Sequence, residues 1–269
     1  MEIAYRVEDG MNRREILCTT YQMRNPFIQF HDGVAGELDA HCYFQHAYAA
    51  SLMNENDSVL DVCCGRGLMI PFLRYGAKNC RAYIGVDICR KNAKWADGFD
   101  PRREKEKKDW GFPCVFVESN VASMADPVQS KVAEPIDLIV YTSAIEHMQP
   151  DDQRSSLAEC RKIIADGGQL YLSCPVTEKG KSGWDTQYRA HIYEPTRAEI
   201  EGWLDGSGFK IAYNYGLCTS MSAIKRLSEN QKRQADYFLK VMPRLQALTT
   251  IPAMFPHIAT EMAFVCHPV

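Results

Sequence analysis

A glycine-rich segment of the chain has the residue types that a nucleotide-binding turn requires. Residues 59–67 read VLDVCCGRG, in which an apolar stretch leads into Gly65 and Gly67. Glycines let the backbone approach a ligand closely, and a helix that opens after such a turn favours polar or anionic groups. Asp87 ends the next apolar stretch, where a carboxylate can accept hydrogen bonds from ribose hydroxyls. This pattern predicts a site for a nucleoside-containing cofactor.

The same segment does not have the fingerprint of a dinucleotide dehydrogenase. That fingerprint needs a third glycine to let the helix pack under a pyrophosphate, and Ile70 stands at this position. Asp61, inside the apolar stretch, also has no role in the dinucleotide pattern. A carboxylate there can instead hold the N-terminal loop or the amino group of an amino-acid moiety.

A second group of residues has the types needed for acid–base chemistry. Glu146 and His147 follow the apolar stretch at residues 136–141, and His191 follows the stretch at residues 169–173. Histidine titrates near neutral pH and is a common general base. If the two stretches are parallel strands, the loops that follow them open on the same edge of the sheet. We therefore expect Glu146, His147 and His191 to lie together as the catalytic residues.

The elements that must position these residues alternate between strand and helix. Short β-branched or aromatic runs predict buried parallel strands, at residues 58–62, 82–86, 113–117, 136–141, 169–173 and 210–215. Residues 151–165 have a helical apolar face and end at Asp166-Gly167-Gly168, and Thr196 with Glu199 forms a capping box for the next helix. Repeated strand–helix–strand units predict a doubly wound α/β sheet.

Two segments fall outside this alternation. Residues 1–57 are rich in aromatic residues and are predicted to form a mostly helical flap. Residues 221–250 are predicted to form one long helix or two shorter ones, ahead of a segment broken by Pro252 and Pro256. Residues 261–266 are predicted to be a final strand.

These motifs, in this order, resemble those of the class I S-adenosylmethionine-dependent methyltransferases. Residues 59–67 resemble the first motif, with Cys63 in place of its first glycine, and residues 83–88 (YIGVDI) resemble the second. Residues 116–124 (FVESNVASM) resemble the adenine-side motif, with Asn120 where the family often has Asp. Residues 136–148 (IDLIVYTSAIEHM) and 191–209 resemble two later motifs. We expect Cys63 to weaken cofactor affinity only modestly.

The resemblance implies a Rossmann-like seven-stranded sheet of order 3-2-1-4-5-7-6, whose strand 7 is antiparallel. It divides the chain into a flap at residues 1–57 and a methyltransferase domain at residues 58–269, with a helical insert at 216–257 between strands 6 and 7. The implied cofactor is S-adenosylmethionine, with S-adenosylhomocysteine as the product. The residues expected to bind it are Asp61, Cys63, Gly65, Gly67, Asp87, Ile88, Asn120, Val121 and Tyr141.

The expected acceptor is a small molecule that is methylated at oxygen or nitrogen. Its pocket is expected to draw on the flap, the insert and the loop after residue 175, because aromatic side chains exclude water from a small pocket. The residues expected to contact the acceptor are Tyr21, Tyr43, Trp184, Tyr188 and Arg189.

Two alternatives stay open. Glu146, His147 and His191 resemble three of the four metal ligands of small-RNA 3′-end 2′-O-methyltransferases, which favours an RNA or nucleotide acceptor. Ser143 stands where those enzymes have a second carboxylate, so we expect a site without metal. The other alternative is a regulator that binds the cofactor without catalysis.

Composition narrows the class of protein further. The 269 residues are 46% hydrophobic and carry a formal net charge of −3, which is typical of a globular chain and makes nucleic acid an unlikely partner. The 11 cysteines form no CxxC pattern, and neither a secretory signal nor an 18-residue apolar run is seen. We expect reduced thiols, a cytoplasmic location and no membrane contact. The oligomeric state stays open.

Overall fold

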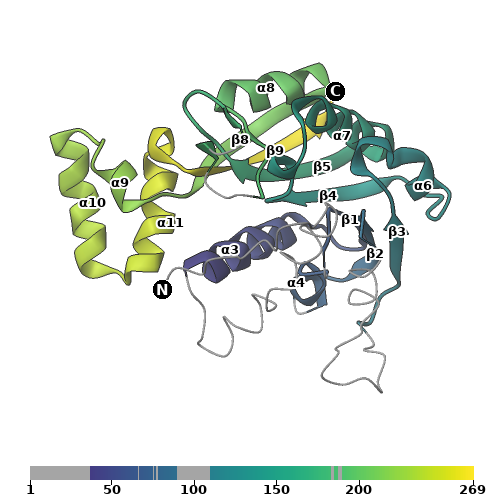
Figure 1. Cartoon of the computed structure of the whole chain (residues 1–269). Coiled ribbons are helices and arrows are strands. Elements are labelled where there is room, and N and C mark those ends of the chain that lie inside the picture. The colour runs from purple at the N-terminus through teal and green to yellow at the C-terminus, as the bar shows by residue number, and fades with distance from the viewer. Residues whose placement is uncertain are drawn as a thin grey trace, which may run out of the picture.

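The computed structural model describes residues 37–65, 67–74, 76, 78–89, 110–182, 185–186 and 190–269. A seven-stranded sheet of order β3-β2-β1-β4-β5-β9-β8 forms its centre (Figure 1). Strands β1 to β5 pair in parallel, whereas β9 is antiparallel to both of its neighbours. The predicted strand order and the antiparallel final strand are therefore confirmed. The strands are β1 (Asp57–Val62), β2 (Cys80–Asp87), β3 (Cys114–Glu118), β4 (Ile136–Thr142), β5 (Ile164–Pro175), β8 (Phe209–Cys218) and β9 (Glu261–Pro268).

Helices cover both faces of this sheet. On one face lie α6 (Ala125–Gln129), α7 (Pro150–Ile163) and α8 (Arg197–Gly206), and on the other lie α3 (Glu37–Leu52) and α4 (Ile70–Arg74) (Figure 1). Side chains of a strand alternate between the faces, so Leu60 and Val62 of β1 join the first core and Val59 joins the second. This is the doubly wound arrangement that continuous apolar strands predict.

Local signals account for the limits of the helices on the first face. The side chain of Thr196 accepts a hydrogen bond from the backbone N–H of Glu199, and the Glu199 carboxylate accepts one from the backbone N–H of Thr196, so the predicted capping box is present. The helix α7 ends at Ile163, and β5 begins at once at Ile164, before the predicted glycine stop. Two short 3-10 helices, η1 (Val121–Ser123) and η2 (Ile145–His147), follow β3 and β4.

Between β8 and β9 the chain forms three helices, not the one or two predicted. These are α9 (Met221–Ile224), α10 (Glu229–Val241) and α11 (Arg244–Met254), followed by η4 (Pro256–Ile258). Their buried apolar side chains form a separate cluster, and the three helices lie beside β8, the edge strand of the sheet (Figure 1). The exact limits and the role of this insert, like those of the flap, stay predictions.

Pro252 does not break α11, contrary to the expectation from sequence. A proline inside a helix leaves the carbonyl four residues earlier without its usual N–H donor. Here that carbonyl belongs to Leu248, and it accepts the backbone N–H of Thr219 at 3.2 Å. The backbone just after β8 therefore supplies the missing donor and joins α11 to the sheet. Gly216 of β8 allows this close approach, since a Cβ there would lie 2.4 Å from the Pro252 carbonyl oxygen.

Two further predictions from the sequence concern reduced thiols and the absence of a membrane-spanning helix. Eight of the described cysteines are free, but Cys89 is disulfide-bonded, so the expectation that every thiol is reduced is not met there. Among the described residues, no helix has the length and apolar character needed to cross a membrane.

Candidate functional site

The glycine-rich segment forms a tight turn between β1 and α4. Cys63, Gly65 and Gly67 have φ angles of 57°, 52° and 69°, which lie in the left-handed region. The backbone N–H of Gly67 donates to the Cys64 carbonyl at 2.8 Å and closes the turn. Glycine reaches this region without steric cost, whereas Cys63 must hold its side chain there under strain. The predicted turn is present. Cys63, which stands where the motif has its first glycine, adopts a backbone conformation that is typical of glycine.

Asp87 fastens this turn to the end of β2. Its Oδ2 accepts the backbone N–H of Gly65 at 2.9 Å, and its Oδ1 accepts that of Cys89 at 2.7 Å. The side chain of Asp87 is buried, whereas the neighbouring Ile88 is 41% exposed. A carboxylate oxygen can accept a second hydrogen bond, so Asp87 has the chemistry to hold a diol beside the turn.

Asp61 lies deeper, within β1. It accepts a hydrogen bond from the Tyr83 hydroxyl at 2.8 Å and is almost fully buried. Burial raises the pKa of Asp61 to about 7, against the opposing effect of the Tyr83 hydrogen bond and with a further rise from the nearby Asp87. Asp61 therefore joins β1, which leads into the turn, to Tyr83 of β2.

The remaining residues predicted to bind the cofactor lie either just after β3 or within β4. Asn120 lies just after β3, and its side chain accepts the backbone N–H of Ala122 at 3.0 Å, so it caps η1. Val121 beside it is buried. Tyr141 of β4 is fully buried, and its hydroxyl lies 3.1 Å from the Ser156 hydroxyl of α7. Any contact of Tyr141 with a cofactor would therefore be made through its backbone.

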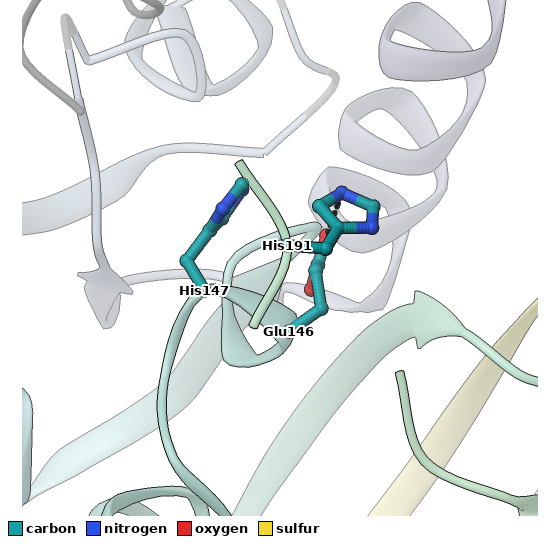
Figure 2. A group of neighbouring side chains, drawn as sticks. All are labelled: Glu146, His147 and His191. Carbon is teal, nitrogen blue, oxygen red and sulfur yellow. Dashed lines mark ion pairs between the residues drawn. The ribbon is translucent and has the colours of Figure 1, made fainter. Parts of the chain in front are cut away.

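Glu146, His147 and His191 meet at the carboxyl end of β4, as their order in the chain predicts. One ligand-type atom from each of the three lies within 4.8 Å of the other two. Figure 2 shows the Glu146 carboxylate beside the His191 ring, and the His147 ring across a gap from both. The backbone carbonyl of Glu146 accepts the N–H of Ile192 at 2.8 Å, which holds the His191 loop against η2. We call these three side chains the EHH cluster.

Burial and neighbouring charges shift the protonation of the EHH cluster. Burial raises the pKa of Glu146 to about 7, while the nearby His191 acts in the opposite direction. For His191, burial disfavours the charged ring, but the hydrogen bond with Glu194 and the carboxylate of Glu146 outweigh it and raise the pKa. The Cys63 thiol, whose pKa is raised mainly by burial, is also influenced by Asp87, Asp61 and Glu146. The EHH cluster and the glycine-rich turn follow the paired strands β4 and β1, so both lie at the same end of the sheet.

A buried hydrogen-bond network that the sequence did not predict borders this site. Gln45 of α3 accepts from the Ser173 hydroxyl at 2.8 Å, and Ser143 donates to Glu261 of β9 at 2.9 Å. Gln45 and Ser143 are also hydrogen-bonded to each other. The partners are 98 to 128 positions apart in the chain. No local pattern marks such a network, because only the sheet brings its members together.

The five residues predicted to contact the acceptor cannot be placed. Their side chains lie outside the part of the chain that the structure describes; they are those of Tyr21, Tyr43, Trp184, Tyr188 and Arg189. Of Tyr43, the structure describes only its backbone within α3.

Comparison with known proteins places most of the chain in one family. Residues 40–214 match a family model described as a methyltransferase domain. No curated protein matches the chain.

Several solved structures share the fold. One is in a Haloferax volcanii complex of a methyltransferase with its activator Trm112 (14% identity, TM-score 0.57, 94% of this chain and 97% of that one). Another is a Synechocystis magnesium protoporphyrin IX methyltransferase with bound S-adenosylmethionine (13%, 0.54, 97% and 100%). A third is a Burkholderia thailandensis 1,6-didemethyltoxoflavin N1-methyltransferase with S-adenosylhomocysteine (16%, 0.52, 96% and 91%).

Proposed function

The chain belongs to the methyltransferase-domain family, and we propose that it transfers a methyl group from S-adenosylmethionine to an oxygen or nitrogen atom of a small molecule. The observation that carries this proposal is the position of the EHH cluster. It lies at the carboxyl end of β4, next to the strand whose end forms the glycine-rich turn. In doubly wound sheets, ligands bind at this edge, where the strand order reverses.

The residues of the turn fit S-adenosylmethionine. Asp87 has a carboxylate for the ribose hydroxyls, and Gly65 and Gly67 leave room for the amino-acid part of the cofactor. The exposed Ile88 and the buried Val121 supply apolar surface for the adenine, with Asn120 at its edge. When bound, S-adenosylmethionine supplies a methyl group already activated by its sulfonium. Positioning of the acceptor is then the main task of the protein, and it can contribute about 7–11 kcal/mol.

The EHH cluster would act on the acceptor. The acceptor atom attacks the methyl carbon, the carbon–sulfur bond breaks, and the proton of the acceptor passes to the cluster. His147 and His191 are the proposed bases, and Glu146 supports the charge that His191 gains. The flap at residues 1–57 and the insert at 216–257, with the five acceptor residues named above, would form the walls of the pocket.

Two observations favour a small acceptor over RNA. The chain has a net charge of −3, and RNA-binding surfaces are normally basic. Two relatives in fold are named for small acceptors, a porphyrin and a toxoflavin precursor. The basic run at residues 102–108 lies outside the described residues. A cytoplasmic location remains a prediction.

A transfer assay tests this proposal. Labelled S-adenosylmethionine is offered with a panel of small alcohols, phenols and amines, and separately with RNA. We expect label in a small acceptor, and at least a tenfold lower rate in His147→Gln and His191→Gln, each of which still binds the cofactor. The matched control is His267→Gln, because His267 is exposed on β9, outside the insert. Labelled RNA whose binding weakens steeply with salt would contradict the small-molecule acceptor, and cofactor binding without any transfer would favour a regulator.

A further inference from the structure

The EHH cluster has the arrangement of a metal-binding site. It brings two imidazoles and one carboxylate together, with their ligand atoms within 4.8 Å of one another. Metal–ligand distances of about 2.0–2.2 Å put the ligand atoms of a tetrahedral ion roughly 3.3–3.6 Å apart. One pair, Oε1 of Glu146 and Nε2 of His191, is already at 3.8 Å. The site therefore needs to close by about an ångström to hold an ion.

Each imidazole is also oriented by a second hydrogen bond on its far nitrogen. Nδ1 of His147 lies 3.0 Å from the Ala190 carbonyl oxygen, and Nδ1 of His191 lies 2.5 Å from Oε1 of Glu194. A carbonyl only accepts, so His147 carries its proton on Nδ1, and a carboxylate favours the same tautomer for His191. In both neutral rings the lone pair is then on Nε2. Ligating histidines usually have such a partner, which fixes the tautomer and the ring.

Two buried carboxylates lie against His191 in the cluster. Glu146 and Glu194 are 1% and 0% exposed, and both form an ion pair with the same residue, His191. Within the described part of the chain, the other oxygen of Glu146, Oε2, is buried and accepts no hydrogen bond. A buried carboxylate oxygen without a donor is costly, and a bound cation removes that cost.

We propose that Glu146, His147 and His191 bind a divalent transition-metal ion, held in place by Glu194 and the Ala190 carbonyl. Two nitrogen ligands and one carboxylate suit ions such as Mn²⁺, Fe²⁺, Co²⁺ or Zn²⁺ better than Mg²⁺ or Ca²⁺, which prefer oxygen. Three protein ligands leave at least one open position. On the basis of the proposed function, that position would bind the acceptor oxygen and lower its pKa before methyl transfer. With both Nε2 atoms on the ion, the metal would replace His147 and His191 as the group that activates the acceptor.

Metal binding can be measured without any turnover. Full-length protein, freed of any affinity tag and stripped with a chelator, is titrated in separate calorimetric runs with Mn²⁺, Co²⁺ and Zn²⁺. The optical spectrum of the Co²⁺ form reports its ligands. The variants are Glu146→Gln, His147→Gln and His191→Gln, with Glu194→Gln for the supporting carboxylate and His267→Gln as the control. S-adenosylmethionine is titrated into every sample, and circular dichroism checks the fold.

We expect one ion per chain, at least tenfold weaker binding in the three ligand variants, and about 10- to 100-fold weaker binding in Glu194→Gln. His267→Gln should bind as the wild type does. Absence of saturable binding by the folded wild type, or equal binding by the ligand variants and the control, overturns the proposal. If S-adenosylmethionine still binds in that case, the proposed function stands with the EHH cluster as a base. Metal binding without cofactor binding would support the metal site and contradict the proposed function.

Discussion

Two strained residues mark the candidate site at the scale of single residues. Cys63 and Ser143 have φ angles of 57° and 44°, and they follow directly the neighbouring strands β1 and β4. Positive φ is rare for residues other than glycine, and such strain tends to be kept at functional sites. The turn near Cys63 and the segment from Ser143 to the EHH cluster are thus both held in unusual conformations at one edge of the sheet.

The substitution Cys63→Gly tests how much this strain matters to the cofactor. Glycine adopts the left-handed backbone without penalty, so the turn should keep its shape and its hydrogen bonds. We expect the affinity for S-adenosylmethionine to change by less than tenfold in a calorimetric titration. The opposite change, Gly65→Ala, places a Cβ on a backbone with a φ of 52° and should weaken binding by more. Tenfold or tighter binding by Cys63→Gly would contradict the account.

Some residues of the candidate site could be predicted from the sequence next to them, and others could not. Gly65, Gly67 and Asp87 could be predicted because each sits at a fixed place relative to a strand end. The meeting of Glu146 and His191 followed from the parallel strands. Gln45 and Glu261 could not be predicted, since they reach the site from α3 and β9 through contacts distant in sequence.

At the scale of elements, α11 and β8 depend on each other. Pro252 deprives α11 of one hydrogen bond, the Thr219 N–H restores it from the end of β8, and Gly216 makes room for the helix. The sequence pattern placed the core strands correctly, because apolar runs with flanking turns are local signals. It ended the helix too early, since the donor that rescues the proline lies 29 positions before the Leu248 carbonyl that accepts it.

The substitution Gly216→Ala tests this contact. An added Cβ would lie 2.4 Å from the Pro252 carbonyl oxygen, so α11 must shift away from β8. We expect a loss of about 1–3 kcal/mol in the free energy of unfolding, measured with urea. The control is Gly202→Ala in α8, where a Cβ would meet no atom within 4 Å. It should gain about 0.5–1 kcal/mol because alanine favours helix. Equal effects of the two substitutions would show that α11 does not pack against β8 as described.

At the scale of the whole molecule, the sheet separates two cores and presents one edge for chemistry. Helices fill both faces, so a ligand can approach the strands only at their ends. The turn after β1, the carboxylate at the end of β2 and the EHH cluster after β4 all lie at the carboxyl ends of neighbouring strands. The fold class was predictable from the order of strands and helices. The acceptor was not, because the residues expected to contact it lie in segments without a regular pattern.

The central claim is that this edge binds S-adenosylmethionine through Asp87. Its most direct test is calorimetric titration of the full chain with S-adenosylmethionine and S-adenosylhomocysteine, beside Asp87→Ala and the exposed-residue control Asp205→Ala. Hydrogen bonds to a charged group contribute about 1.5–3 kcal/mol each, so losing those to the ribose should weaken binding by about 100-fold or more. The account predicts micromolar binding by the wild type and by Asp205→Ala, and little or none by Asp87→Ala. No binding by folded wild-type protein, or unchanged binding by Asp87→Ala, would contradict it.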